Sequence, residues 1–332
     1  MLLRKLAAGL VFLGGVAVVA AADLPVVRFA SVGNSHVCLA RQMLDLPSKI
    51  DVVFLGSSRI RRGLKPETFV EATGGEYETV YNLGRPSRLI LCSESIITHL
   101  VETGRAPKVV VLEIDLDEIR FGSPGPRQWN RTEPGHLTYA ELLAALPADT
   151  ESRWHLIVDG IRHKLAISVA RHFSGITTRV LLSASDEPAP HVCWRNSFDK
   201  DDDRRRRHRA QAEDASRQMF GDGPDATDGR FADERTPKAE VELAVLDRIR
   251  QRLDATGTRL VVIRPMGYAD PPLAPEVMDK VTALIPEFRA PPDGLARQLS
   301  RLVIDKNHFG PEGRELYTRW LAGVVLAEME TP

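Results

Sequence analysis

Short apolar runs alternate with longer segments of helical character along two parts of the chain. The runs end at glycine, proline or polar residues, as buried strands of a parallel sheet do, and they cover residues 52–55, 77–83, 109–112, 259–264 and 302–304. Between them, apolar residues at helical spacing or a proline suited to a first turn predict helices over residues 66–73, 89–103, 239–257, 275–285 and 311–328. This alternation predicts an α/β fold, with a central parallel sheet and crossover helices.

The middle of the chain breaks the alternation. Residues 121–238 are dense in proline, glycine and charge, so we interpret them as a helical and irregular insertion in one domain that spans residues 23–332. Within this insertion, residues 200–208 are acidic and then basic. Neighbouring charges of opposite sign largely neutralise each other, which favours a solvated loop over a polyanion site.

The amino-terminal residues 1–22 carry a different pattern. Arg4 and Lys5 precede an uncharged apolar run over residues 6–22. This order is typical of a secretory signal peptide, and the run is also nearly long enough to span a bilayer as an anchor. Both interpretations predict a periplasmic or otherwise extracytoplasmic location, with attachment to the membrane if the segment is retained.

Charge and cysteine content narrow the choice of function. The chain has 44 Lys and Arg against 45 Asp and Glu, a net charge of -1, which offers no general attraction to nucleic acid. The three cysteines, Cys38, Cys92 and Cys193, form no CxxC motif, so no structural zinc site is predicted, and one disulfide remains open. Nothing in the sequence calls for a cofactor.

Candidate chemistry lies at two predicted strand ends. Ser57 and Ser58 follow the run at 52–55, where a serine can either face a substrate or simply cap a helix. Near the other end of the chain, Asp305 and His308 lie between the last predicted strand and the final helix. The carboxylate can orient the imidazole so that Nε2 acts as a base, although such a pair can also form a simple turn or half of a metal site. A serine beside an oriented histidine is typical of covalent acyl transfer.

Taken together, the motifs resemble those of the SGNH, or GDSL-like, hydrolase superfamily. The resemblance rests on four blocks in order, at residues 54–58, 82–84, 110–115 and 305–308. It implies the three-layer, flavodoxin-like fold of that superfamily.

The resemblance also implies roles for individual residues. Ser58 aligns with the nucleophile, and Ser57 stands where the family commonly has Asp. His308 and Asp305 align with the base and its acid. Gly84, with its neighbour Asn82, falls in the block whose glycine donates a backbone N–H to the oxyanion.

One departure from the family pattern bears directly on catalysis. Asp115 stands where the family places an Asn side chain in the oxyanion hole. An ionised carboxylate cannot donate a hydrogen bond, and loss of one such donor costs about 100- to 1,000-fold in rate. Either Asp115 points elsewhere, or Arg59 or another donor compensates, or turnover is slow.

The amino-terminal segment and the Gly-Ser-Ser-Arg variant are most similar to the extracytoplasmic branch, which includes proteins of alginate acetylation and teichoic-acid alanylation. The resemblance therefore implies a serine esterase or O-acyltransferase for acyl, especially acetyl, esters of an envelope or extracellular polysaccharide. Its partners would be an acylated glycan and a membrane-bound O-acyltransferase.

Two alternatives remain open. One is a catalytically silent accessory protein that keeps the fold and binds a glycan or the acyltransferase. The other, ranked last, is a metal-dependent hydrolase that uses Glu113, Asp115, Asp117 and His308, without the helix-borne histidine spacing of common zinc enzymes.

Overall fold

The protein is described here by a computed structural model. The residues that it describes are Met43, 46–84, 90–114, 237–264, 275–304 and 308–330.

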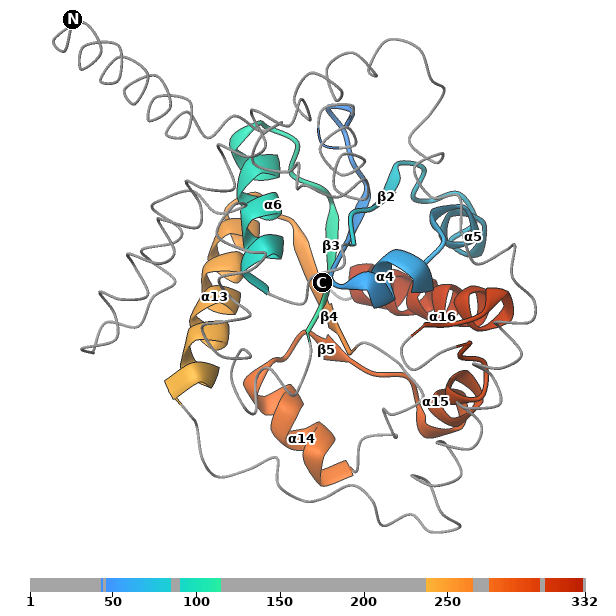
Figure 1. The fold of residues 1–332 in the computed structure, drawn as a ribbon. Coiled ribbons are helices and arrows are strands. Elements are labelled where there is room, and N and C mark those ends of the chain that lie inside the picture. The colour runs from blue at the N-terminus through green and yellow to red at the C-terminus, as the bar shows by residue number, and fades with distance from the viewer. Residues whose placement is uncertain are drawn as a thin grey trace, which may run out of the picture. The chain divides into compact units, whose positions relative to one another are not determined.

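The chain divides into two compact units. One comprises residues 47–123 and 196–332, and the other comprises residues 1–46 and 124–195. All of the described strands belong to the first unit, which therefore carries the sheet (Figure 1).

Strands and helices alternate through this unit. In chain order the elements are β1 (Val52–Leu55), α4 (Ser58–Gly63), α5 (Pro66–Ala72), β2 (Val80–Asn82), α6 (Ile90–Glu102), β3 (Val109–Glu113), α13 (Pro237–Asp254), β4 (Arg259–Ile263), α14 (Pro275–Leu284), β5 (Phe288–Arg289), α15 (Asp293–Ser300) and α16 (Pro311–Glu330).

The described strands form one parallel sheet. Its strand order is β2-β1-β3-β4-β5, and every neighbouring pair runs parallel. The predicted α/β fold with a central parallel sheet is therefore confirmed. The strand order reverses between β1 and β3, which is where ligands bind in doubly wound sheets, beyond the carboxyl ends of the strands.

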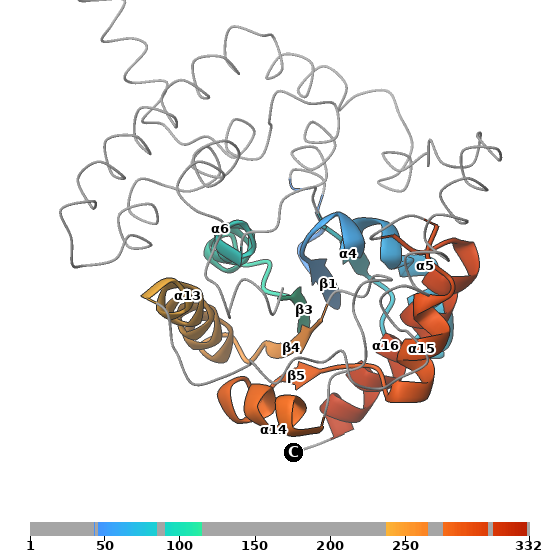
Figure 2. The same cartoon turned by 60° about the horizontal axis from the view of Figure 1, so that its bottom comes forward.

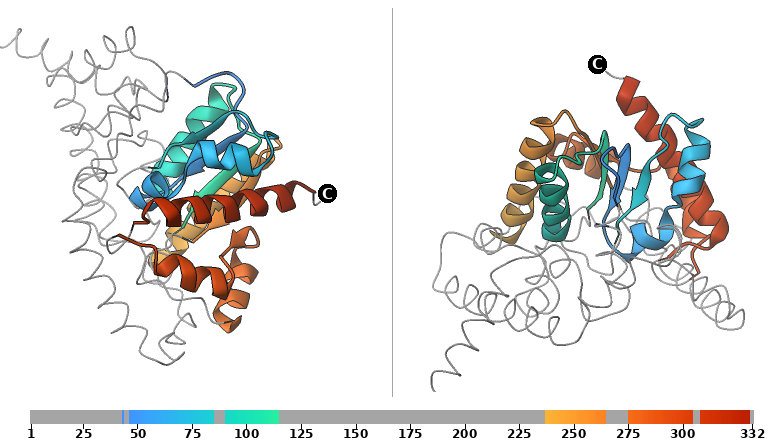
Figure 3. Two further views of the ribbon diagram at one scale, coloured as in Figure 1. Left: turned by 90° about the vertical axis from the view of Figure 1, so that its right-hand side faces the viewer. Right: turned by 90° about the horizontal axis from the view of Figure 1, so that it is seen from above.

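Helices cover both faces of the sheet. Figures 2 and 3 show α6 and α13 together on one face, with α5 and α16 on the other. Alternate strand residues point to opposite faces. On the face of α5 and α16, the buried core includes Val52, Phe54, Val109, Val111, Val261, Ile263, Phe69, Leu321 and Val325. The apolar runs in the sequence are thus continuous, without alternating polar residues, because both faces are covered.

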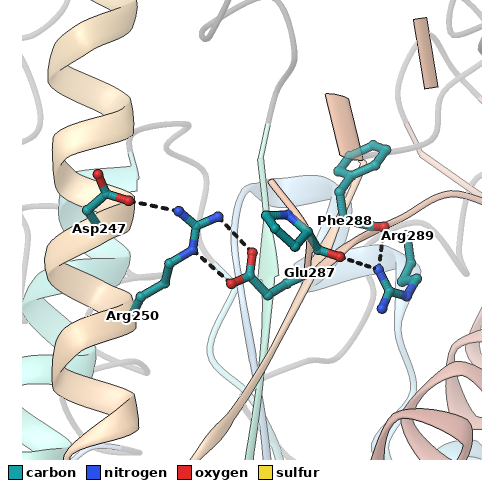
Figure 4. Close-up of polar contacts among 6 residues, drawn as sticks. Asp247, Arg250, Glu287, Phe288 and Arg289 are labelled. Carbon is teal, nitrogen blue, oxygen red and sulfur yellow. Dashed lines mark hydrogen bonds and ion pairs between the residues drawn. The ribbon is translucent and has the colours of Figure 1, made fainter. Parts of the chain in front are cut away.

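An ion-pair chain links α13 to the edge strand β5. Arg250 of α13 donates to both carboxylate oxygens of Glu287, at 2.8 and 2.7 Å, and also pairs with Asp247 (Figure 4). One residue beyond Phe288, Arg289 donates to the carbonyl oxygens of Pro286 and Phe288. These contacts hold a strand of two residues that has few ladder hydrogen bonds of its own.

The structure corrects some expected elements. Residues 302–304 do not form a sheet strand: Val303 makes an isolated antiparallel bridge with Phe309. The fifth strand is instead Phe288–Arg289, and the strand expected over residues 77–83 is limited to Val80–Asn82.

Several predictions concern residues outside the described ranges. The amino-terminal segment 1–22 is one, and the insertion 121–238 is another, except that its last two residues begin α13. Among the helices that the structure describes, none is both long and apolar enough to cross a membrane.

Candidate functional site

The turn after β1 places two serines in different surroundings. Leu55 ends the strand, Ser57 caps α4, and Ser58 is the first residue of that helix. Ser57 is buried, and its hydroxyl oxygen accepts a hydrogen bond from the Arg59 N–H at 3.0 Å. Ser58 is only partly buried, so it is the more exposed of the two serines.

Ser58 meets the histidine from the other end of the chain. The distance between Ser58 Oγ and His308 Nε2 is 3.0 Å, which is a hydrogen bond across 250 positions in sequence. A nucleophile and a base that share a proton are found at this distance. The sequence predicted that these two loops meet, and the structure brings them together.

His308 is held by a narrow loop before α16. The Ile304 N–H donates to the His308 carbonyl oxygen at 2.8 Å, and the Gly310 N–H donates to the Leu302 oxygen at 2.8 Å. The next side chain, Phe309, is buried and contacts the Tyr317 ring with centroids 5.3 Å apart. The backbone that carries the imidazole is therefore held by these paired backbone groups and by the burial of Phe309.

Asn82 fastens α4 to the end of β2. Its side-chain Nδ2 donates to the carbonyl oxygens of Ile60 and Leu64, at 2.9 and 3.0 Å, near the end of that helix. Its Oδ1 accepts from the Gly84 N–H at 3.0 Å. Since Asn82 is buried and both ends of its amide are engaged, it positions the helix that begins with Ser58 rather than facing a substrate.

Gly84 lies against α4. A Cβ atom at this position would come within 2.6 Å of the Arg61 backbone nitrogen, so close packing accounts for the glycine. Its N–H donates to Asn82 in this structure, which differs from the expected role as an oxyanion donor.

The Ser58 N–H is the better-placed donor. Among the residues that the structure describes, no acceptor is found for it, as expected for the first residues of a helix. It belongs to the same residue as the hydroxyl, so it lies next to any carbonyl that Ser58 attacks. The Ser58 N–H is therefore available to an oxyanion, whereas the Gly84 N–H, which the family resemblance suggested, is engaged with Asn82.

A buried carboxylate lies beneath the serine turn. Glu113 ends β3, and its Oε2 and Oε1 accept from the Ser57 N–H and hydroxyl, both at 2.7 Å. The sequence pointed to Glu113 only as a candidate metal ligand. The sequence does show an acid at the end of a buried strand, and a buried acid needs a hydrogen-bond partner nearby, but it does not show that this partner is Ser57.

Some of the remaining predicted site residues lie outside the residues that the structure describes. Asp305 and Asp115 lie outside the described residues, as does Asp117 of the metal alternative. Arg59 is the second residue of α4, and its predicted part in oxyanion binding stays a prediction. Within the described ranges, no group of His, Cys, Asp and Glu side chains has the arrangement of a metal site.

Comparison with known proteins adds no family to this geometry. No protein-family model matches the chain, and no curated protein matches it in sequence.

Proposed function

We propose that the chain is a serine esterase or O-acyltransferase of the SGNH-hydrolase type, with Ser58 as nucleophile and His308 as base. The observation that carries the proposal is the 3.0 Å hydrogen bond between Ser58 Oγ and His308 Nε2 at the carboxyl ends of the strands. The strand order and the four sequence blocks support the same superfamily and its three-layer fold.

The proposed reaction proceeds through an acyl-enzyme. His308 Nε2 takes the proton of Ser58 Oγ while that oxygen attacks an ester carbonyl, and the protonated imidazole then returns the proton to the leaving alcohol. Water hydrolyses the acyl-enzyme, or a sugar hydroxyl accepts the acyl group. Asp305, three residues before His308, is the proposed partner that orients the imidazole.

The developing oxyanion needs donors at the same place. The Ser58 N–H is the donor that the described residues offer, and Arg59 is the proposed second donor. With Asp115 in place of the family's Asn, we expect turnover to be slower than in enzymes with a full set of donors.

The proposed substrate is an acylated, especially acetylated, polysaccharide of the cell envelope or extracellular matrix. This part rests on the sequence resemblance and on the amino-terminal segment 1–22, which implies an extracytoplasmic site of action. A membrane-bound O-acyltransferase is the corresponding proposed partner.

The test uses the full chain, purified in detergent, with p-nitrophenyl acetate as substrate. Wild type should release p-nitrophenol, whereas Ser58→Ala and His308→Ala should each lower kcat by at least about 1,000-fold. Ser57→Ala is the comparison at the neighbouring serine, whose buried hydroxyl is not the proposed nucleophile, and it should lower kcat by no more than about 100-fold. Equal rates for wild type, Ser58→Ala and His308→Ala would rule the proposal out.

A second candidate is a catalytically silent accessory protein that binds a glycan or an acyltransferase. The observation in its favour is the Gly84 N–H, which donates to Asn82 instead of to the oxyanion position. A fluorophosphonate probe separates the two candidates, because it labels only an activated serine. Labelling that is lost in Ser58→Ala supports the enzyme, and an unlabelled wild type supports the accessory protein.

A further inference from the structure

Glu113 is a buried acid next to the proposed nucleophile, and the reaction described above does not use it. Only 8% of its surface is exposed. Its two carboxylate oxygens accept from the same residue, one from the Ser57 N–H and one from the Ser57 hydroxyl, each at 2.7 Å. A carboxylate held by two short hydrogen bonds to one residue fixes both the position and the orientation of that residue.

The sheet brings Glu113 to this position. Leu55 of β1 pairs with Leu112 of β3, so Gly56 and Glu113 follow side by side at the carboxyl edge. A Cβ atom at Gly56 would lie 2.4 Å from Glu113 Oε2, and the backbone there has a φ of 151° that L side chains rarely adopt. The carboxylate can reach the Ser57 N–H because residue 56 has no side chain.

The contacts continue from Ser57 into the helix that carries the nucleophile. Ser57 Oγ donates to Glu113 and accepts from the Arg59 N–H, so the residues before and after Ser58 are both tied to one hydroxyl. Ser58 itself is left to contact His308. A change at Glu113 would therefore move Ser58 Oγ relative to His308 Nε2 without altering either group.

We infer that Glu113 is a positioning residue, which holds the Ser57 turn so that Ser58 Oγ faces the His308 imidazole. The inference rests on the proposed function, because it assigns Glu113 a part in that reaction. Glu113 acts through Ser57 and does not touch the substrate. The length of the Glu113 side chain is the property that this role needs, because one oxygen must contact the Ser57 N–H while the other contacts the Ser57 hydroxyl.

The same contacts give a physical reason for serine at position 57. An ionised Asp there would place a second carboxylate against Glu113, where a serine instead supplies a proton to it. The serine can still cap α4, as it does here.

Two substitutions separate reach from charge. Glu113→Gln keeps the length, so its oxygen can accept from the Ser57 N–H while its amide donates to Ser57 Oγ. Glu113→Asp keeps the charge but is one methylene shorter, so its carboxylate cannot reach both the Ser57 N–H and the Ser57 hydroxyl.

We expect Glu113→Asp to lower kcat for p-nitrophenyl acetate, and the rate of fluorophosphonate labelling, by about 10- to 100-fold, as small displacements of reacting atoms do. Glu113→Gln should stay within about 5-fold of wild type in both, and KM should change less than kcat in each variant.

Asp51→Asn is the matched control for a structural effect. Asp51 also accepts from a backbone N–H and a hydroxyl of one residue, Thr79. It precedes β1, however, and so lies where the strands begin, away from their carboxyl ends. Activities are compared at a temperature at which melting curves show every variant folded, and there Asp51→Asn should keep the wild-type kcat.

The outcomes distinguish the two proposals. If Glu113→Asp turns over as fast as wild type, or Glu113→Gln is as slow as Glu113→Asp, the inference about reach is wrong while Ser58 remains the nucleophile. If wild type is not labelled at Ser58, the proposed function fails and the inference fails with it.

Discussion

The sheet has an amino edge, where its parallel strands begin, and a carboxyl edge, where they end. Both use the same hydrogen-bonding chemistry, but for different purposes. At the amino edge, Asp51 accepts from the Thr79 N–H and hydroxyl and joins the starts of β1 and β2. At the carboxyl edge, Glu113 accepts from the Ser57 N–H and hydroxyl and joins the end of β3 to the turn after β1. Each carboxylate thus ties two segments that are neighbours in the sheet but distant in sequence.

The difference lies in what surrounds each carboxylate. Asp51 pairs with Lys108 at 2.8 Å, and that lysine is largely exposed to solvent. Burial would raise the pKa of Asp51, but the hydrogen bonds from Lys108 and Thr79 outweigh it and lower the pKa to about 2. Glu113 instead is buried and holds Ser57, whose neighbour Ser58 contacts His308, and these last two residues are partly exposed. The comparison indicates that the amino edge stabilises the fold, whereas the carboxyl edge holds the proposed nucleophile and base in place.

The largest contrast between the edges should appear at two glycines. Gly56→Ala puts a Cβ against Glu113 in a turn with a positive φ, and we expect a loss of about 3–5 kcal/mol in unfolding free energy together with most of the turnover. Gly257, just before β4 at the amino edge, also has a positive φ, but a Cβ there would meet no atom of the described residues within 4 Å beyond its chain neighbours. Gly257→Ala should cost only about 1–2 kcal/mol and leave kcat unchanged. Urea unfolding and p-nitrophenyl acetate kinetics measure both, and equal effects of the two substitutions would contradict the contrast.

The two ends of β2 give the next contrast. Asn82→Ala removes the amide that donates to the Ile60 and Leu64 carbonyl oxygens, although the Ile60 oxygen still accepts from the Leu64 N–H, so we expect a loss of about 3 kcal/mol. Because the helix held by Asn82 begins at Ser58, kcat should fall as well. Thr79→Val at the other end removes the hydroxyl that donates to Asp51, and it should cost about 1 kcal/mol with kcat unchanged. A normal kcat in folded Asn82→Ala would show that the amide does not position the nucleophile.

The sequence predicted the parts of this arrangement that depend on continuous patterns. Runs such as 109–112 are apolar because both faces of β3 are covered, so they identify central strands directly. Gly-Ser-Ser lies at the carboxyl end of β1, where parallel strands present polar residues. The approach of His308 to Ser58 was expected from the motifs and the family resemblance, but the strand expected before His308 is only an isolated bridge between Val303 and Phe309, so the prediction of that strand was wrong.

Other features had no such pattern. β5 has two residues and α4 has six, which is too short for periodicity to show. The pairing of Glu113 with Ser57 depends on the register of β1 against β3, and a single acid at a strand end does not reveal that register. Likewise, the choice of Ser58 over Ser57 came from the family resemblance, and the different burial of the two residues became visible only in the fold.

The pH dependence of stability should come in part from the amino edge. The pKa of Asp51 is about 2 in the folded protein against an ordinary value of 3.8, so the folded state favours its ionised form. The contribution, about 2 kcal/mol, is complete above about pH 4 and is lost as the pH falls toward 2. Asp51→Asn should lower stability by this amount at pH 7 and by much less at pH 2, as urea unfolding at each pH would show. A constant difference between wild type and Asp51→Asn over this range would contradict the lowered pKa.

The smallest effect should be found before β4, again at the amino edge. Thr258 is buried, and its hydroxyl donates to the Pro107 carbonyl oxygen at 2.7 Å, which links the approaches to β3 and β4. Thr258→Val keeps the shape of the side chain but removes the donor, so we expect a loss of about 1 kcal/mol in unfolding free energy. Since this hydrogen bond holds backbone at the edge away from Ser58, kcat and KM should equal those of wild type. A fall in kcat while Thr258→Val is fully folded would mean that the two edges are coupled. The division of the sheet into an edge that stabilises the fold and an edge that holds the proposed catalytic groups would then be wrong.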